Sequence, residues 1–564
     1  MKKNILVLLV LFQAVKVPAQ FFNWAAENQT AYFSTVSDVA IDPAGNVISV
    51  GYFVQQVDLD PGPGLSDFYE NGPGGPDIFI QKLDAGGNYL WGMSLGNTGF
   101  GYAKRVVTDA SGNIYVMGEF NDNFDADPGP GVNWLSNASN YNTFLLKFNG
   151  AGNLAWAKCL RSAADEHGVF LACHADTVIT IGGTMNDSVD FDPGPNTVSP
   201  GTIGGQDCYV LQLDSGGNYL WSKIFGSPSA ADKLFSGTTD LQGNIVLTGE
   251  FHDSADFDPG PGTAILTDTQ GALFLLKLNT AGNFVFAGQY GNQQGTSNIP
   301  CALHCDASGN ICIAGYTPSV PAFDFDPGTG IALDNSGPTA SAFVLKTDNA
   351  GSLLWFQPYH CSTGCITSLA LHFYTTGSIV LAATYSGNLD FDPGPGVMML
   401  NSTPGNTDFF VAYLSGINGS LSSLKSIGSS NVRQEVYCCK TDISENLFLG
   451  GYIENSTDLD PGTGTYLINN FGMTEGFLAR WGPESTAVQE SVSVPALALY
   501  PNPVHDLLFI QGNYTEFLLS DVTGKIIGSG NALYQIPLGD YTSGIYFLRL
   551  NTGEGWLTRR IVKY

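Results

Sequence analysis

The sequence predicts an all-β protein: a seven-bladed β-propeller closed by an N-terminal strand, followed by a small C-terminal β-sandwich. Three observations predict it. One acidic phrase recurs seven times at a near-constant spacing, short apolar strand patterns separated by tight turns surround each copy, and the pattern changes after residue 483. A fixed period of this length is typical of repeat architectures, in which neighbouring units bury a shared core.

The repeat is marked by the phrase Asp-x-Asp-Pro-Gly. Successive copies are 65 to 68 residues apart. Each copy contributes a pair of aspartates, and the seven pairs are Asp58 and Asp60, Asp125 and Asp127, Asp190 and Asp192, Asp256 and Asp258, Asp324 and Asp326, Asp390 and Asp392, and Asp458 and Asp460.

Each repeat is expected to contain two hairpins. The first is clearest at residues 106–118, around the turn Gly112-Asn113, and the second at residues 144–156, around Gly152-Asn153. Gly and Asn tolerate the positive φ that tight hairpins demand. Four strands in about 66 residues fit a propeller blade better than a solenoid coil.

The two ends of the repeat region complement each other. The seventh repeat ends after its third strand, at Trp481, whereas residues 22–25 match the fourth-strand pattern, with Trp24 in the position of Trp91. A fourth strand supplied by the N-terminus would close the ring and remove exposed sheet edges. Residues 20–483 are therefore expected to form the propeller.

Residues 1–19 read as a secretory signal peptide. Lys2 and Lys3 precede a short apolar run, and small residues at 17–19 resemble a cleavage site. The run is too short to span a bilayer, and no later segment is long and apolar enough to be transmembrane. At the other end, residues 484–494 read as a polar linker, and the short strands of residues 495–564 suggest a β-sandwich.

Composition and net charge limit the classes of binding partner. The chain is 43% hydrophobic and carries a net charge of −29, so it is globular and repels nucleic acid and anionic membranes. The ten cysteines lack the spacing of a disulfide framework. Cys305 and Cys312 flank a hairpin turn and could pair across it, but buried free thiols are the favoured reading.

The acidic phrase is the main candidate for chemistry. Two aspartates two residues apart on a strand point to the same side, and Ca²⁺ takes six to eight oxygens, so calcium is a possible cofactor at the 14 aspartates. The alternative is structural and is favoured: Asp accepts a backbone hydrogen bond, Pro fixes φ, and Gly permits the turn that follows. The phrases are expected on the connection between strands two and three. All seven would then lie around one face of the propeller, together with the long loops.

Catalytic constellations are not evident. The seven histidines are scattered, and no nucleophile elbow, zinc-protease or phosphate-loop motif occurs. We therefore expect no catalytic residue, and the sequence predicts a protein that is not an enzyme.

Two segments resemble known families. The stretch from Asp109 to Gly118 resembles the bacterial SBBP repeat, which implies a seven-bladed β-propeller. The C-terminal module resembles the sorting domain of Bacteroidetes type IX secretion substrates, through Tyr500, Pro501, Asn502, Pro503, Gly544, Tyr546 and Lys563. That resemblance implies the type IX secretion machinery as a partner, passage across the outer membrane, and release or attachment at the cell surface.

These observations predict an exported binding or adhesion module for an extracellular glycan or protein. A polysaccharide-acting hydrolase or lyase is the first alternative, and a structural surface-layer component is the second. The near-identity of the repeats argues against an enzyme, because an active site needs one repeat to differ.

Overall fold

The computed structural model describes residues 20–564 with short gaps, and all its regular secondary structure is β-strand. The expected signal peptide (1–19) and linker (484–494) lie outside the described residues. The gaps are residues 31, 73–74, 97–98, 137–140, 163, 230, 292–300, 318–322, 329, 334–340, 364–365, 393–396, 404, 429–431, 463, 469–472, 484–497, 501–503, 512–513, 523, 534 and 552–555. The chain divides into two compact units, Met1–Glu484 and Ser485–Tyr564.

The described part of the first unit holds seven antiparallel sets of four strands, numbered here as sheets 1 to 7. In sheets 1 to 6 the strands follow in chain order. Sheet 1 comprises β2 (Phe33–Ile41), β3 (Val47–Val54), β6 (Asp77–Leu83) and β7 (Tyr89–Leu95). Sheet 2 comprises β8 (Gly101–Thr108), β9 (Ile114–Phe120), β12 (Asn142–Phe148) and β13 (Leu154–Cys159). Sheet 3 comprises β15 (Glu166–His174), β16 (Val178–Met185), β18 (Asp207–Asp214) and β19 (Tyr219–Phe225). Sheet 4 comprises β20 (Lys233–Thr239), β21 (Ile245–Asp256), β22 (Ile265–Leu278) and β23 (Phe284–Tyr290), and sheet 5 comprises β24 (Cys301–Cys305), β25 (Ile311–Thr317), β26 (Ser341–Thr347) and β27 (Leu353–Thr363). Sheet 6 comprises β28 (Ile366–Phe373), β29 (Ile379–Tyr385), β32 (Asp408–Leu414) and β33 (Leu421–Ile427). Sheet 7 comprises β34 (Gln434–Thr441), β35 (Leu447–Ile453), β38 (Glu475–Pro483) and β1 (Gln20–Thr30).

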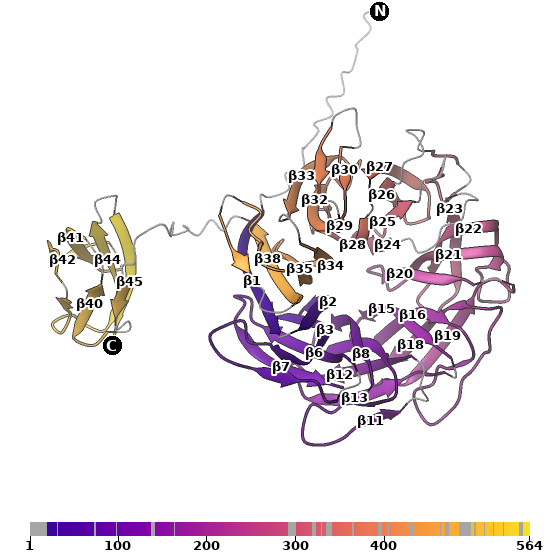
Figure 1. Ribbon diagram of the computed structural model, residues 1–564, viewed down its shortest axis with the longest axis horizontal. Coiled ribbons are helices and arrows are strands. Elements are labelled where there is room, and N and C mark those ends of the chain that lie inside the picture. Colours follow the sequence, from indigo (N-terminus) through magenta and orange to yellow (C-terminus); the bar gives the residue numbers. More distant parts are fainter. Residues whose placement is uncertain are drawn as a thin grey trace, which may run out of the picture. The chain divides into compact units, whose positions relative to one another are not determined.

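The fourth strand of sheet 7 comes from the other end of the chain. β1 pairs antiparallel with β38, from Gln20 opposite Pro483 to Asn28 opposite Gly476. The first strand of each sheet contacts the first strand of the next, and β34 of sheet 7 contacts β2 of sheet 1. Figure 1 shows these sheets arranged in chain order around a common centre, with β1 beside β38.

Short strands flank the acidic phrases, on the connection between the second and third strands. Most form small hairpins with the phrase at the bend. They are β4 (Gln56–Asp58), β5 (Asp67–Tyr69), β10 (Asn123–Asp125), β11 (Trp134–Ser136), β17 (Val189–Asp190), β30 (Asn388–Asp390), β31 (Met399–Asn401), β36 (Thr457–Asp458) and β37 (Leu467–Ile468). β17 pairs instead with β14 (Arg161–Ser162), which follows the fourth strand of sheet 2.

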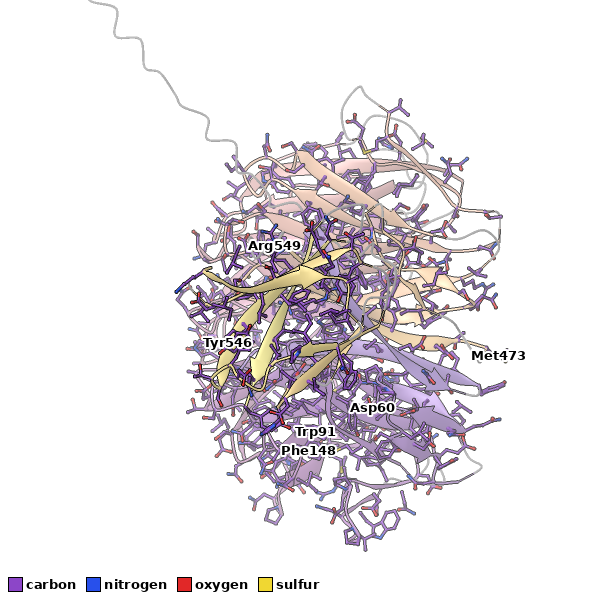
Figure 2. All side chains as sticks on the ribbon, turned by 90° about the vertical axis from the view of Figure 1, so that its left-hand side faces the viewer. Asp60, Trp91, Phe148, Met473, Tyr546 and Arg549 are labelled. Atoms are coloured by element: carbon purple, nitrogen blue, oxygen red, sulfur yellow. The ribbon has the colours of Figure 1, made fainter. Side chains whose placement is uncertain are left out.

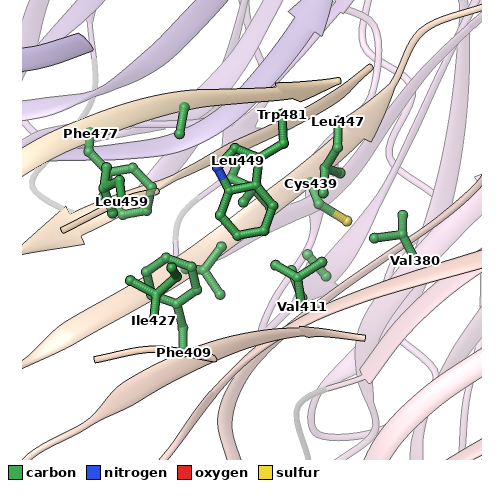
Figure 3. Packing of buried hydrophobic residues seen from close by; sticks show 14 of the residues in the cluster. Val380, Phe409, Val411, Ile427, Cys439, Leu447, Leu449, Leu459, Phe477 and Trp481 are labelled. Atoms are coloured by element: carbon green, nitrogen blue, oxygen red, sulfur yellow. The ribbon is translucent and has the colours of Figure 1, made fainter. Parts of the chain in front are cut away.

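The core of the first unit lies between neighbouring sheets. The middle strands are buried on both faces, as in β9, where every residue is buried. Between sheets 6 and 7, Phe409 and Val411 of β32 pack with Leu449 and Trp481 of sheet 7 (Figure 3). Burial of this apolar surface between sheets is the main stabilising term, because a single four-stranded sheet cannot bury both of its faces.

The second unit has its own core. A three-stranded sheet comprises β39 (Ala498–Tyr500), β40 (Leu507–Gln511) and β43 (Gln535–Pro537), and a four-stranded sheet comprises β41 (Glu516–Ser520), β42 (Ile526–Asn531), β44 (Gly544–Asn551) and β45 (Trp556–Lys563). Leu508, Leu519 and Leu548 are buried together. Along β44 burial alternates, so that Tyr546 is buried and Arg549 is exposed (Figure 2).

Candidate functional site

Each acidic phrase forms a hydrogen-bonded turn. The first aspartate accepts two backbone N–H groups on Oδ1, one from the second aspartate at 3.0–3.2 Å and one from the residue eight positions on at 2.8–2.9 Å. The second aspartate accepts the N–H of the phrase glycine at 2.7–2.8 Å in six copies. In the copy at Asp390, the proline and glycine lie outside the described residues.

The phrases also fasten neighbouring sheets together. Asp58 of sheet 1 pairs with Gln29 of β1, and Asp390 of sheet 6 pairs with His360 at the end of β27. Asp190 pairs in the same way with Arg161, which follows the last strand of sheet 2. The residue between the two aspartates is buried in all seven copies. The repeated phrase is therefore a turn that buries its middle residue and links adjacent sheets through its backbone.

Calcium at the phrases stays a prediction. Each phrase supplies two carboxylates, and in the six fully described copies both Oδ1 atoms already accept backbone hydrogen bonds. Across the described residues, no group of three or more His, Cys, Asp or Glu side chains is arranged to hold a metal ion. Calcium at a phrase would therefore depend on backbone carbonyls and water for most of its ligands.

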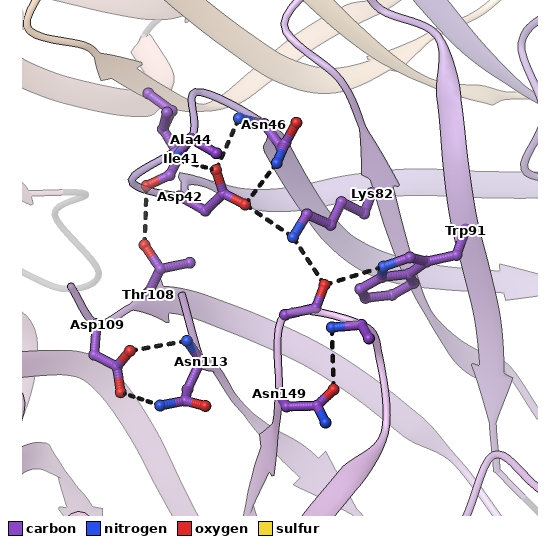
Figure 4. Close-up of polar contacts among 12 residues, drawn as sticks. Ile41, Asp42, Ala44, Asn46, Lys82, Trp91, Thr108, Asp109, Asn113 and Asn149 are labelled. Carbon is purple, nitrogen blue, oxygen red and sulfur yellow. Dashed lines mark hydrogen bonds and ion pairs between the residues drawn. The ribbon is translucent and has the colours of Figure 1, made fainter. Parts of the chain in front are cut away.

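The opposite end of the sheets, where the tight turns lie, is occupied by a second repeated link. Lys82 forms an ion pair with Asp42 at 2.8 Å and donates a hydrogen bond to the Gly150 carbonyl of sheet 2 at 2.9 Å (Figure 4). Trp91 Nε1 donates to the same carbonyl at 3.4 Å. Burial raises the pKa of Asp42, but the hydrogen bonds from Lys82 and Asn46 outweigh it and the net shift is downward.

The same link recurs around the unit. Lys277 pairs with Asp240 at 3.0 Å and Lys346 pairs with Asp306 at 2.8 Å. In sheet 7, Trp24 and Arg480 both donate to the Ala85 carbonyl of sheet 1. The lysine series thus joins adjacent sheets, and the recurring tryptophans donate hydrogen bonds in the same links.

At the phrase end, seven aromatic side chains of sheets 7, 1 and 2 form a continuous, partly exposed cluster that the repeat does not predict. We call it the aromatic patch. Ring centroids lie 4.9 Å apart for Tyr52 and Tyr102, 5.6 Å for Phe33 and Tyr52, and 5.9 Å for Tyr437 and Tyr452. The members are Phe33, Tyr52, Phe100, Tyr102, Tyr141, Tyr437 and Tyr452. Phe100 and Tyr437 are each 37% exposed.

A charged cluster borders the patch between sheets 2 and 3. Glu119 accepts a hydrogen bond from Lys104 and lies 2.9 Å from His167 Nδ1. The hydrogen bond to Glu119 raises the pKa of His167, whereas burial and neighbouring phenols raise the pKa of Tyr102 to about 12. The cluster therefore offers a carboxylate, an ammonium group and an imidazole next to an aromatic surface.

The first strands of all seven sheets line a central cavity of about 170 Å³. His304 lines this cavity, and its ring lies tilted against that of His372, with the ring centroids 4.2 Å apart. Burial and Lys440 lower the pKa of His304 to about 4, and burial and His304 lower the pKa of His372. Cys305 and Cys312 are free thiols, because the residue opposite Cys312 is His304.

The residues of the sorting signal are only partly described. Tyr500 ends β39, whereas Pro501, Asn502 and Pro503 lie outside the described residues. Gly544 begins β44, and Tyr546 donates to the Thr542 carbonyl at 2.6 Å. Lys563 is buried and donates to the His505 carbonyl at 2.5 Å. The Lys563 contact ties the last strand to the segment that follows the Pro-Asn-Pro sequence.

Residues 498–564 match the family described as secretion system C-terminal sorting domain. This match indicates type IX secretion to the cell surface or extracellular space, and so an interaction with the secretion machinery. Within the described residues, no helix has the length and hydrophobicity to cross a membrane.

The other likenesses are distant. An uncharacterized WD repeat-containing protein of Acanthamoeba polyphaga mimivirus is 21% identical over 65% of this chain and 25% of its own length. The regulatory protein FlaEY of Caulobacter vibrioides is 22% identical over 31% of this chain, so the chain spans a quarter or less of these curated relatives. Among solved structures, a PL25 ulvan lyase is 10% identical, with a TM-score of 0.36 over 81% of this chain and 97% of its own. A Dyadobacter fermentans protein of unknown function is 10% identical, with a TM-score of 0.32 over 66% of this chain and 93% of its own. None of these likenesses carries an argument about activity.

Proposed function

We propose that the first unit is a seven-bladed β-propeller closed by β1, and that it is an exported module that binds an extracellular glycan through the aromatic patch. Three features support the closed ring: the pairing of β1 with β38, the contact of β34 with β2, and the cavity lined by seven first strands. The hydrogen bonds from Trp24 and Arg480 to sheet 1 join the two ends of the same ring.

The single observation that carries the binding role is the aromatic patch. Tyrosine and phenylalanine rings present flat apolar faces on which the C–H face of a sugar ring stacks, and the phenol groups hydrogen-bond to sugar hydroxyls. Tyr437 O–H already donates to Glu435 at 2.8 Å, so a carboxylate acceptor lies within the patch. Aromatic residues at a solvent-facing surface are typical of binding hot spots.

A glycan array probed with the purified first unit tests this proposal. We expect binding to at least one glycan class, with affinity falling at least tenfold in Tyr52→Ala and Tyr102→Ala. Trp134→Ala is the matched control, because Trp134 is also an exposed aromatic residue but lies outside the patch. An array without binding, or binding that only Trp134→Ala loses, would contradict the proposal. An array without binding is also the result expected if the ligand is a protein.

A polysaccharide-acting hydrolase or lyase is the second candidate, and the cluster of Lys104, Glu119 and His167 favours it. A carboxylate and an imidazole within hydrogen-bond distance form the kind of pair that transfers protons to and from a bound sugar. Release of reducing ends, or of unsaturated products absorbing in the ultraviolet, separates this reading from binding alone. The enzyme reading requires product release that Glu119→Gln abolishes while glycan binding is retained.

Closure by β1 has its own test. Removing residues 20–30 takes away the edge strand that covers β38 and the Trp24 side chain. We expect the shortened protein to melt at a much lower temperature or to aggregate, because an uncovered β38 exposes an unpaired sheet edge. An unchanged melting temperature would contradict closure.

A further inference from the structure

Two buried carboxylates meet at the junction of sheets 3 and 4. Asp207 begins β18, and Asp232 immediately precedes β20; their exposed fractions are 0% and 1%. A Cβ atom built on Gly226 would lie 2.8 Å from Asp207 Oδ1 and 2.7 Å from Asp232 Oδ2. An oxygen of each carboxylate therefore lies against the same glycine, closer than a Cβ atom at this position would allow.

Equivalent positions at other junctions between sheets can be compared with this carboxylate pair. At five described junctions, a residue at the start of a first strand donates its backbone N–H to the carbonyl just before the third strand of the preceding sheet. Asp232 donates in this way to Gln206 at 2.8 Å. The equivalent bonds run from Gly101 to Pro76, Glu166 to Tyr141, Gln434 to Thr407 and Ser34 to Thr474. The facing pairs there are Asp77 with Gly101, Asn142 with Glu166, Asp408 with Gln434, and Glu475 with Ser34. Of the junctions compared, that of sheets 3 and 4 alone places two acids together.

The charge of this pair is not balanced by the described side chains. Asp207 Oδ2 accepts the N–H groups of Ile203 and Gly204, and Asp232 accepts those of Ser227 and His252. None of the described ion pairs includes either aspartate, and Asp207 Oδ1 has no hydrogen-bond partner among the described residues. Burial raises the pKa of both groups, and the Asp207 charge raises that of Asp232 further. Two buried like charges are costly unless a proton or a cation lies between them.

We propose that Asp207 and Asp232 bind one calcium ion that links sheets 3 and 4. Asp207 Oδ1 and Asp232 Oδ2 supply the two anionic ligands, and the buried Ser227 hydroxyl is a neutral oxygen beside them. Calcium suits the place better than magnesium, because calcium accepts an irregular set of oxygens, whereas magnesium demands octahedral geometry and keeps several waters. Since both sheets must be in place to form the site, calcium binding stabilises the folded ring.

Thermal melting of the full-length protein, in chelator and in calcium, tests this site. Calcium about 100-fold above its dissociation constant should raise the melting temperature by about 3 °C in a unit of this size. In D207N the response to calcium should vanish, whereas D77N, which changes a single acid at the equivalent position of sheet 1, should keep it. Elemental analysis after dialysis should find one calcium per chain in the unaltered protein and in D77N, and none in D207N.

Other outcomes would overturn the proposal. Equal melting temperatures in chelator and in calcium would show that a shared proton relieves the pair. In that case D207N would raise the melting temperature in both conditions. A calcium response that survives in D207N but is lost in D60N would move the site to the acidic phrases.

Discussion

The two ends of the sheets differ in how their side chains are used. At the turn end, the charged and aromatic residues recur from sheet to sheet and are engaged in links such as that of Lys82, Asp42 and Trp91. At the phrase end, the acidic phrases also recur and also form links, but the aromatic patch, as far as the described residues show, lies on sheets 7, 1 and 2. Recurring residues therefore link the sheets, whereas the partly exposed aromatic residues that depart from the repeat are the ones on which the proposed glycan binding rests.

Breaking a turn-end link gives the largest expected effect. Lys277 and Asp240 are both almost fully buried, so Lys277→Met leaves an uncompensated carboxylate in the interior. We expect the free energy of unfolding to fall by about 3–5 kcal/mol. Denaturant unfolding measures this loss, and Lys277→Met combined with Asp240→Asn should recover most of it. Lys147→Met is the milder control, at about 1 kcal/mol, because Lys147 is half-buried and donates to the Ser215 carbonyl.

The phrase end should show a pH dependence that comes from Asp77. Burial raises the pKa of Asp77 to about 7, against about 4 in an unfolded chain. Because the folded state holds the proton more tightly, this group stabilises the protein fully below pH 4, and its contribution is lost as the pH rises through about 7. The loss is on the order of 4 kcal/mol. Asp77→Asn should flatten this part of the stability curve, and an unchanged slope would contradict the assignment.

The two aspartates of a phrase should differ in importance. Asp125 accepts two backbone hydrogen bonds and lies at the link to sheet 1, whereas Asp127 accepts one at an exposed turn. We expect Asp125→Ala to cost about 2 kcal/mol of unfolding free energy and Asp127→Ala about 1 kcal/mol. Equal costs would mean that the link between sheets contributes nothing.

The sequence predicts the periodic part of the molecule well, because each strand and turn is written several times. The phrase lies between strands two and three as expected, and Trp24 occupies the position predicted from Trp91. The patch could not be predicted from the period, because its rings come from sheets whose residues lie 400 positions apart. One signal was present. The residue after a recurring glycine varies, and is Tyr52 after Gly51, Glu119 after Gly118, and Tyr452 after Gly451.

The glycine in this pair recurs for a steric reason that the sequence alone does not reveal. A Cβ on Gly51 would lie 1.8 Å from the Thr35 carbonyl oxygen, and one on Gly451 would lie 1.8 Å from that of Glu435. The next residue is free of this constraint. Likewise, Asp207 and Asp232 meet only because the third strand of one sheet packs against the first strand of the next, which no local pattern records.

The most direct test of the account measures glycan binding and thermal stability together in two aromatic variants. Trp156 links sheets 2 and 3 through the Ser215 carbonyl, whereas Tyr102 lies in the patch. We predict that Trp156→Ala lowers the melting temperature and keeps glycan affinity, and that Tyr102→Ala keeps the melting temperature and loses at least tenfold in affinity. Trp156→Ala losing affinity at a temperature where it remains folded, or Tyr102→Ala binding as tightly as the unaltered protein, would contradict the division between recurring links and a single binding patch.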